Sequence, residues 1–476
     1  MTSLWVVLLM VIVYMAVVAA ISYVVRRSSK TSEGFTSGGR AFPAFLIGFL
    51  LMSEFIGTSA TIGTSQSAYS FGISAAWNVL ALAIGFILFG IFLAKQFRAL
   101  GENTISGALA QNYGESVRIA TSLIMTAALM IVAVAIYAAG GAILHQLLGL
   151  DRSWAIVGVG VLATLYVVVG GMRSVVYTNV LHAVMKLAAV ALLTVVGISR
   201  VGGIGELRAR LPEASFSYDG VGWAQIFAWL IAGIGAIFAT QYVIQAVVTV
   251  RDPGHAQRAA FYAALMLVPF GILAALVGMC SAVLYPEIES IDALPVLAVD
   301  MNPVATGFVM CGLVGAILGS IAALIIGAST LLMRDFYQPY FNRAGDDRKD
   351  LVFLRVATVA TGVVPIALAL FASDVLAVTF LAKSLRASLA VLVVLMFYKP
   401  GYGSRRGALI SILLAVPATI GWFLAGDPFG VDNAYIAVAT PLVVMTLAQL
   451  LSRNDSAPPG IVKVERSPLG AQGENS

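Results

Sequence analysis

Residues 53–67 read S-E-F-I-G-T-S-A-T-I-G-T-S-Q-S and lie inside a longer apolar segment, 43–70. The stretch places an acid, Glu54, two glycines and a run of hydroxyl side chains where a lipid-facing helix would carry apolar ones. Irregular backbone at membrane depth survives only where protein buries it or where it lines a cavity. Transporters bind ions and substrates at such broken helices. Close packing through small residues is the alternative, but it does not require a charge, so the pattern favours a broken helix.

The composition of the whole chain is typical of a membrane protein. Of its 476 residues, 60% are hydrophobic and 11% are charged, whereas a soluble domain carries roughly 25% charged residues. The net charge of +5 does not indicate a nucleic-acid partner, because the basic residues are scattered over short loops. Cys280 and Cys311 lie in apolar runs, which predicts small core residues rather than a disulfide framework. The expected surroundings are a lipid bilayer.

A helix needs about 20 apolar residues to cross a bilayer, and the chain contains thirteen candidate segments. They are approximately 4–25, 43–70, 75–97, 119–148, 153–170, 177–199, 222–248, 258–284, 304–333, 352–373, 375–398, 407–425 and 434–452. The first is too long for a signal peptide and is interpreted as a retained helix. The segments predict one transmembrane domain over 1–453, and the polar stretch 454–476 predicts a disordered cytoplasmic tail.

The loops between these segments predict the orientation of the chain. One set of loops carries most of the Lys and Arg residues, whereas the opposite set carries only Arg152, Arg200, Arg208 and Arg210. Basic loops stay in the cytoplasm. We therefore expect a multi-pass protein of a bacterial-type inner (plasma) membrane, with the N-terminus outside and the C-terminus inside, as an odd number of crossings requires.

Five ionisable side chains lie deep inside the candidate segments. They are Glu54, His182, Lys186, Lys383 and Arg386. A charge at that depth is costly and is functional by default, with a partner to be identified. For His182 and Lys383 a structural role near a helix end is the alternative, since long polar side chains can reach toward the interface.

Two further segments carry polar side chains. In 222–248, Gln241 and Gln245 are four residues apart and share one face, beside Tyr242. Amides and a phenol inside a membrane helix usually face a polar cavity. Segment 304–333 contains G-A-I-L-G-S-I-A-A-L-I-I-G-A-S-T. Its small and hydroxyl residues suit either tight packing against the second segment or ion coordination, and both interpretations stay open.

Short motifs along most of the chain resemble those of the solute:sodium symporters, which include the bacterial proline and galactose symporters. The motifs are E-G-F-T-S-G-G-R (33–40), E-N-T-I-S-G-A-L-A-Q-N-Y-G (102–114), G-G-M-R-S-V-V-Y-T-N-V-L-H (170–182), Q-Y-V-I-Q (241–245) followed by A-Q-R-A-A (256–260), D-A-L-P-V-L (292–297) and M-R-D-F-Y (333–337). Each motif is weak alone, and their order and spacing carry the resemblance.

The resemblance implies an all-α fold with a LeuT-type core. Two inverted five-helix repeats, 43–199 and 222–398, would follow an extra first helix, 4–26, and precede two extra helices, 407–452. A sodium ion would lie between the second and ninth helices. Its candidate ligands are the carbonyls of Met52, Phe55 and Ala316, together with Gly319 and Ser320, where the family usually has two hydroxyl residues. Candidate substrate contacts are Glu54, Gly57, Thr58, Phe238, Gln241 and Tyr242, with helix 11, which carries Lys383 and Arg386, closing the site.

Three residues depart from the family pattern around the sodium site. Gly319 stands in place of a hydroxyl ligand, and Asn179 replaces an acid. Lys186 adds an ammonium on the face of Asn179, because seven residues bring a helix back to within about 20°. Hard cations want oxygen ligands and negative charge. The resemblance thus favours Na⁺ as the coupling ion, whereas these residues favour H⁺, with Asn179 and Lys186 as coupling residues.

The sequence as a whole predicts a secondary transporter that carries a small organic solute by ion-coupled symport. Lys186, Lys383 and Arg386 outnumber Glu54 at depth, so we expect an anionic solute such as a mono- or dicarboxylate. The alternative is that Lys383 and Arg386 face an outer, water-filled vestibule. A membrane-embedded sensor and an ion-independent exchanger are the rival functions. No enzyme is expected, because H-E-x-x-H and G-x-S-x-G are missing from the sequence. The sequence leaves the oligomeric state open.

Overall fold

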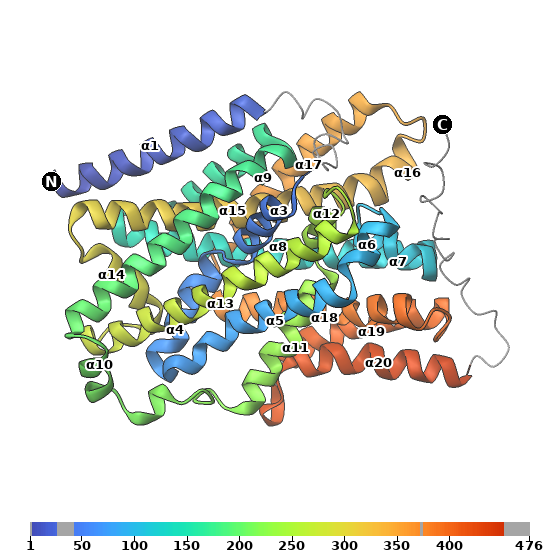
Figure 1. Cartoon of the computed structure of the whole chain (residues 1–476). Helices are drawn as coiled ribbons and strands as arrows, with labels where there is room; N and C mark the ends of the chain where they lie inside the picture. The colour runs from blue at the N-terminus through green and yellow to red at the C-terminus, as the bar shows by residue number, and fades with distance from the viewer. Residues whose placement is uncertain (1, 26–41, 372–374, 452–476) are drawn as a thin grey trace, which may run out of the picture.

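The computed structural model describes residues 2–25, 42–371 and 375–451 as a bundle of helices (Figure 1). In these ranges the one sheet-like feature is an isolated bridge between Phe42 and Val250. The all-α prediction is therefore confirmed. The motif 33–40, the tail 454–476 and several of the basic loop residues used for the orientation lie outside the described residues.

Fourteen of the helices form the body of the bundle. They are α1 (Thr2–Val25), α3 (Ala44–Phe55), α4 (Thr58–Phe71), α5 (Trp77–Phe92), α8 (Glu115–Leu148), α9 (Arg152–Val201), α11 (Trp223–Ala239), α12 (Gln241–Val247), α13 (Pro253–Leu284), α15 (Pro303–Leu332), α17 (Asp347–Ala369), α18 (Val375–Tyr398), α19 (Arg405–Leu424) and α20 (Asn433–Leu451). Short helices connect them, namely α6 (Ala94–Leu100), α7 (Ile105–Tyr113), α10 (Ile204–Arg210), α14 (Ala293–Val299) and α16 (Gln338–Phe341).

The number of membrane crossings differs from the expected thirteen. Ten helices in the described ranges are long and apolar enough to cross a membrane, or eleven if the bent pair α11–α12 counts as one. The count leaves out Ala44–Phe55 and Arg152–Val168 as shorter apolar helices, and it joins Ala60–Phe92 into one span. A helix that breaks near the midplane has halves shorter than the roughly 20 residues of a full crossing. The count of thirteen is therefore not confirmed.

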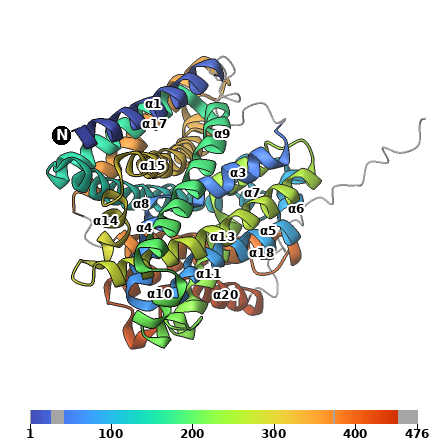
Figure 2. The same cartoon turned by 60° about the vertical axis from the view of Figure 1, so that its left-hand side comes forward.

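Burial separates a central helix from peripheral ones. The apolar window of α15 is 94% buried, whereas those of α1 and α20 are 17% and 22% buried. Figures 1 and 2 show α15 among α1, α8, α9 and α17, all of which contact it. A helix that is apolar all round belongs in a core or a bilayer. This arrangement agrees with α1, α19 and α20 as additions around a core, although the predicted repeat boundaries stay a proposal.

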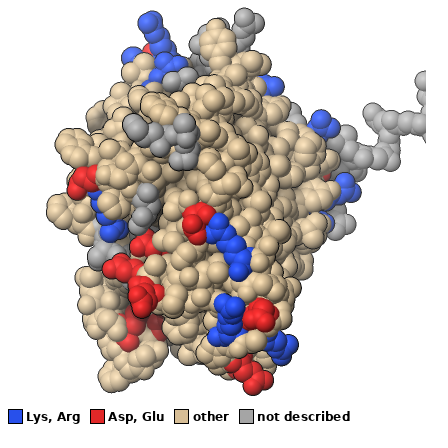
Figure 3. Space-filling model, turned by 90° about the vertical axis from the view of Figure 1, so that its left-hand side faces the viewer, with Lys and Arg blue, Asp and Glu red and all other residues tan. Residues whose placement is uncertain are grey.

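The two ends of the described chain lie at opposite ends of the bundle, with Thr2 on the left and Leu451 on the right of Figure 1. An odd number of crossings requires this, but which end faces the cytoplasm stays a prediction. Figure 3 shows the end that carries α10 and α14, with scattered charges of both signs on a mostly uncharged surface. Arg200 and Asp300 form an ion pair of 2.5 Å here. The Tyr285 hydroxyl and Arg200 hold the pKa of Asp300 below its usual range.

Candidate functional site

The predicted break in the second segment is present between α3 and α4. Helix α3 ends at Phe55, and Ile56 and Gly57 adopt non-helical backbone angles (φ −92°, ψ 72° and φ −84°, ψ 179°) before α4 begins at Thr58. A Cβ atom at position 57 would lie 3.0 Å from Ser320 Oγ, so glycine permits the close approach of α15. Gly57 also has no side chain to cap the first N–H groups of α4.

A second break lies between α11 and α12. The two helices meet at Thr240 with a bend of 50°, and the Thr240 hydroxyl donates to the carbonyl of Ala236. No proline or glycine marks this break in the sequence, so sequence patterns gave no signal for it. The two breaks place polar backbone in the interior of the bundle, as the transporter prediction requires.

The ammonium of Lys186 lies at the end of α3. Its Nζ donates to the carbonyl oxygen of Ser53 at 2.5 Å and to Ser53 Oγ at 2.9 Å. The hydroxyl of Ser320 donates to the same carbonyl at 3.1 Å. All three residues are buried. Helices α3, α9 and α15 therefore converge on an ammonium beside Gly319 and Ser320, two of the residues that the resemblance implies as sodium ligands.

Gly319 and Asn179 complete the surroundings of this ammonium. A Cβ atom at Gly319 would lie 2.6 Å from Asn179 Oδ1 and from Ser53 Oγ, and 3.0 Å from Lys186 Nζ. The amide of Asn179 donates to the carbonyl of Val175 at 2.9 Å, and its Oδ1 has no partner among the described residues. A hydroxyl side chain at 319 and the ammonium thus compete for one space.

The other predicted sodium ligands have different contacts. The carbonyl of Met52 accepts the N–H of Ile56 at 3.1 Å. The ring of Phe55 lies 5.2 Å from that of Tyr242. Ala316 is buried on α15, and its role as a ligand stays a prediction. Sequence reasoning missed Ser53, whose position in the broken stretch was the available signal.

Glu54 is the most unusual residue of the site. It is 4% exposed, and neither carboxylate oxygen has a hydrogen-bond partner among the described residues. Lys186 and Tyr242 lie within electrostatic reach of it. Removing an ionised carboxylate from water without a partner is expensive. A ligand or a proton must therefore complete its surroundings.

Arg386 lies against the second break. Its Nε donates to the carbonyl of Ala382 at 2.9 Å, and its Nη1 donates to Thr240 Oγ1 at 3.1 Å and Tyr242 Oη at 3.4 Å. The side chain is 2% exposed. No ion pair involves Arg386 within the described ranges.

Lys383 lies one turn away on α18 and has neutral partners. Its Nζ donates to Asn78 Oδ1 at 3.0 Å and lies 4.4 Å from the centre of the Phe380 ring. Asn78 donates in turn to Thr64 Oγ1 at 3.1 Å. Lys383 is buried rather than reaching the interface. Sequence reasoning missed Asn78 and Phe380, which no motif singles out.

Thr58, Phe238 and His182 have neutral partners. Thr58 Oγ1 donates to the carbonyl of Ile136 at 3.3 Å, and the ring of Phe238 lies 6.4 Å from that of Phe89. His182 is fully buried, with Nδ1 2.5 Å from Tyr14 Oη. His182 Nε2 has no partner in the described part of the chain. The substrate roles of Thr58 and Phe238 stay predictions.

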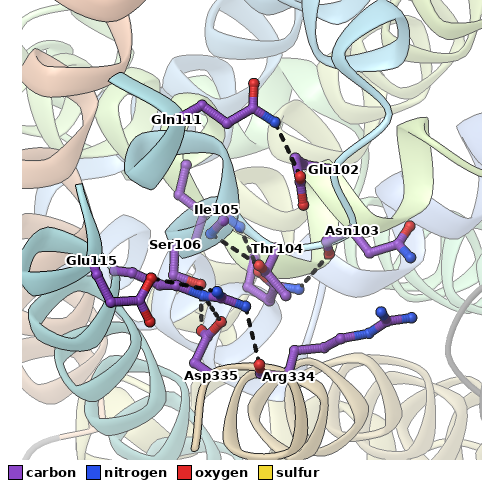
Figure 4. A network of polar contacts seen from close by, with 12 residues as sticks. Glu102, Asn103, Thr104, Ile105, Ser106, Gln111, Glu115, Arg334 and Asp335 are labelled. Carbon is purple, nitrogen blue, oxygen red and sulfur yellow. Dashed lines mark hydrogen bonds and ion pairs between the residues drawn. The ribbon is translucent and has the colours of Figure 1, made fainter. Parts of the chain in front are cut away.

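Gln241 bonds a separate polar network at one end of the bundle, in which Figure 4 labels Asn103, Ile105, Ser106 and Asp335. Its amide donates to the carbonyl of Asn103 at 2.9 Å and accepts the N–H of Ile105 at 2.9 Å. These bonds hold the turn before α7 against α12. They favour a gating role for Gln241 over the predicted substrate contact, which stays untested.

The same network contains an ion pair. Arg118 Nε lies 2.7 Å from Asp335 Oδ1, and Ser106 Oγ donates to the same carboxylate. Arg118 also donates to the carbonyl of Arg334 at 3.0 Å. We call Ser106, Arg118, Gln241 and Asp335 the α7 lock. The lock joins α7, α8 and α12 to the turn after α15, at the end predicted to be cytoplasmic.

Replacing Asp335 with asparagine is expected to loosen the α7 lock. The Asp335 side chain is 0% exposed and that of Arg118 is 26% exposed, so solvent weakens this ion pair in part. We therefore expect the equilibrium between the closed and open forms of the lock to move toward the open form by about 1–2 kcal/mol, or about five- to thirtyfold. The measurement is the labelling rate of a cysteine at Ala246 in a protein without Cys280 and Cys311. Glu115→Gln, which removes an exposed partner of Arg118, is the control, and equal labelling in both variants would contradict the lock.

The sequence of this chain is similar to those of known transporters. The model of the sodium:solute symporter family matches residues 35–415. The high-affinity proline transporter PutP of Bacillus subtilis is 25% identical over 435 residues, covering 84% of this chain and 88% of that protein. The sodium/glucose cotransporter of Vibrio parahaemolyticus is 23% identical, covering 94% and 91%.

Solved structures agree on the fold. A substrate-bound, outward-open Na⁺-coupled sialic acid symporter superposes with a TM-score of 0.84 at 16% identity, over 96% of this chain and 99% of that one. MhsT in complex with L-phenylalanine gives 0.52 at 15% identity, over 86% and 99%. The predicted LeuT-type fold is confirmed, and the chain belongs to the sodium:solute symporter family.

Proposed function

We propose that this protein imports a small organic carboxylate by symport with protons, and that the ammonium of Lys186 takes the place of a sodium ion. Symport of a small solute coupled to an ion is the activity of the family. The observation that carries the finer proposal is the pair of bonds from Lys186 to Ser53 at the broken helix.

The donor set around Lys186 does not suit a sodium ion. Hard cations need oxygen ligands and negative charge, whereas this site has Gly319 without a side chain and Asn179 without a charge. The ammonium donates to the Ser53 carbonyl that also contacts Ser320. It can therefore join α3, α9 and α15 without a metal ion, and a buried amine can also release and take up a proton.

The charges around the two breaks support an anionic solute. Arg386 and Lys383 are buried and form no ion pair within the described ranges. Unpaired cations at this depth are costly. The planar fork of a guanidinium binds both oxygens of a carboxylate.

The proposal predicts solute uptake that does not need sodium. Wild-type protein in proteoliposomes should accumulate a carboxylate in response to a pH gradient, with a rate that changes by less than about twofold when choline replaces sodium. A protonophore should abolish accumulation, as the control for coupling. About tenfold stimulation by sodium at constant pH, equal to about 1.4 kcal/mol, would instead favour the sodium-coupled mechanism of the family.

We further propose that the N-terminus faces outward and the C-terminus inward, as the basic loops predict. The α7 lock would then close the cytoplasmic side of the transporter. Helices α3 to α9 and α11 to α18 would form the two inverted repeats, with the charged residues between them.

A further inference from the structure

The carboxylate of Glu54 is buried without hydrogen-bond donors among the described residues. Both of its oxygens lack a hydrogen-bond partner among the described residues, although the side chain is 4% exposed. An ionised carboxylate accepts hydrogen bonds at about four lone-pair sites. Such a group buried without donors is among the most costly arrangements in a protein. A proton can neutralise the group, and while Glu54 is ionised the missing donors must come from something that enters the site.

The nearby cations do not supply these donors. Lys186 is within electrostatic reach of Glu54, but its ammonium is bonded to Ser53. Arg386 makes its bonds to Ala382, Thr240 and Tyr242 through Nε and Nη1, none of them to Glu54, and a guanidinium has five N–H donors in all. No ion pair of 4.0 Å or less links Glu54 to either cation within the described ranges.

Glu54 and Arg386 nevertheless flank the same side chain. The Tyr242 hydroxyl accepts from Arg386 at 3.4 Å, and its ring lies 5.2 Å from that of Phe55, the neighbour of Glu54. Tyr242 is also within electrostatic reach of Glu54. An anion-binding group, Arg386, and an acceptor-only group, Glu54, are thus both neighbours of Tyr242.

We infer that the solute is a carboxylate that also bears an O–H or N–H donor, such as a hydroxy acid or an amino acid. Its carboxylate would bind Arg386, and its hydroxyl or ammonium would donate to Glu54. This inference rests on the proposed carboxylate transport. A site built to bond such a group rejects the analogue that lacks it, because the buried acceptor is then left unpaired.

The experiment compares ligands that differ in one group. Equilibrium binding of propionate, 2-hydroxypropionate, 3-hydroxypropionate and alanine is measured on the purified full-length protein and on Glu54→Gln. Wild type should bind at least one donor-bearing acid about tenfold or more tightly than propionate, the usual effect of a hydrogen bond to a charged group. Glu54→Gln should reduce that preference to about threefold or less, because neutral hydrogen bonds are about half as strong. Propionate binding should change little.

Two controls separate the possible results. Glu287→Gln changes an exposed acid and should keep the wild-type preference, whereas Glu54→Met removes every acceptor and should abolish it. If wild type binds propionate and the donor-bearing acids equally, or if Glu54→Gln keeps the preference, the inference is wrong while carboxylate transport stands. If none of the acids binds and a neutral sugar or a cation does, the proposed function itself fails.

Discussion

Arg386→Gln is expected to weaken binding of the transported carboxylate by about 2–5 kcal/mol, the usual cost of removing one partner of a buried charge pair. The guanidinium is 2% exposed and is held by Thr240 and Tyr242 at the break between α11 and α12. Glutamine keeps hydrogen-bonding capacity but loses the charge and the planar fork. The solute carboxylate would then be buried without a counter-charge.

The measurement is equilibrium binding of the best ligand to wild type and variant, with thermal unfolding as a check on folding. Arg355→Gln, which changes an exposed arginine on α17, should bind as wild type does. Lys383→Gln should have a smaller effect, because Lys383 already has Asn78 and the Phe380 ring as partners. Equal binding by Arg386→Gln would support a water-filled vestibule around this residue and contradict our assignment.

Lys186→Met is expected to lower proton-driven accumulation by about tenfold or more, because it removes two hydrogen bonds from a charged donor at the broken helix.

A sodium-dependent transporter should result when the departures from the family pattern are reversed together. The variant Lys186→Met with Gly319→Ser and Asn179→Asp restores a hydroxyl ligand and a negative charge. Sodium should then stimulate uptake by about tenfold, equal to about 1.4 kcal/mol.

Single variants provide the controls for this switch. Gly319→Ser alone should lose activity, because its Cβ would lie 3.0 Å from Lys186 Nζ and the added side chain would displace the ammonium, which the triple variant lacks. Uptake is measured in proteoliposomes with imposed pH or sodium gradients. If Lys186→Met keeps full proton-driven accumulation, or if wild type already depends on sodium, the substitution of an ammonium for the ion is wrong.

Several features of the fold could be predicted because they depend on local sequence. Apolar segments of sufficient length indicate membrane helices, and the glycine and hydroxyl residues after Glu54 predicted the break at Gly57. Family motifs predicted the LeuT-type fold. The predicted count of thirteen crossings was not confirmed, since α3 is short and α9 is one continuous helix over two predicted segments. The break at Thr240 has no glycine or proline and went unpredicted.

The sequence alone predicted the burial of Glu54, His182, Lys186, Lys383 and Arg386, because each lies inside an apolar run, whereas the burial of Asp335, outside those runs, went unpredicted. The tertiary structure decided their partners. Lys186 bonds Ser53, 133 positions away, and Gln241 bonds the turn before α7. A hydrogen bond depends on distances of about 3 Å between helices. Those distances follow from how distant segments pack, which no local pattern encodes.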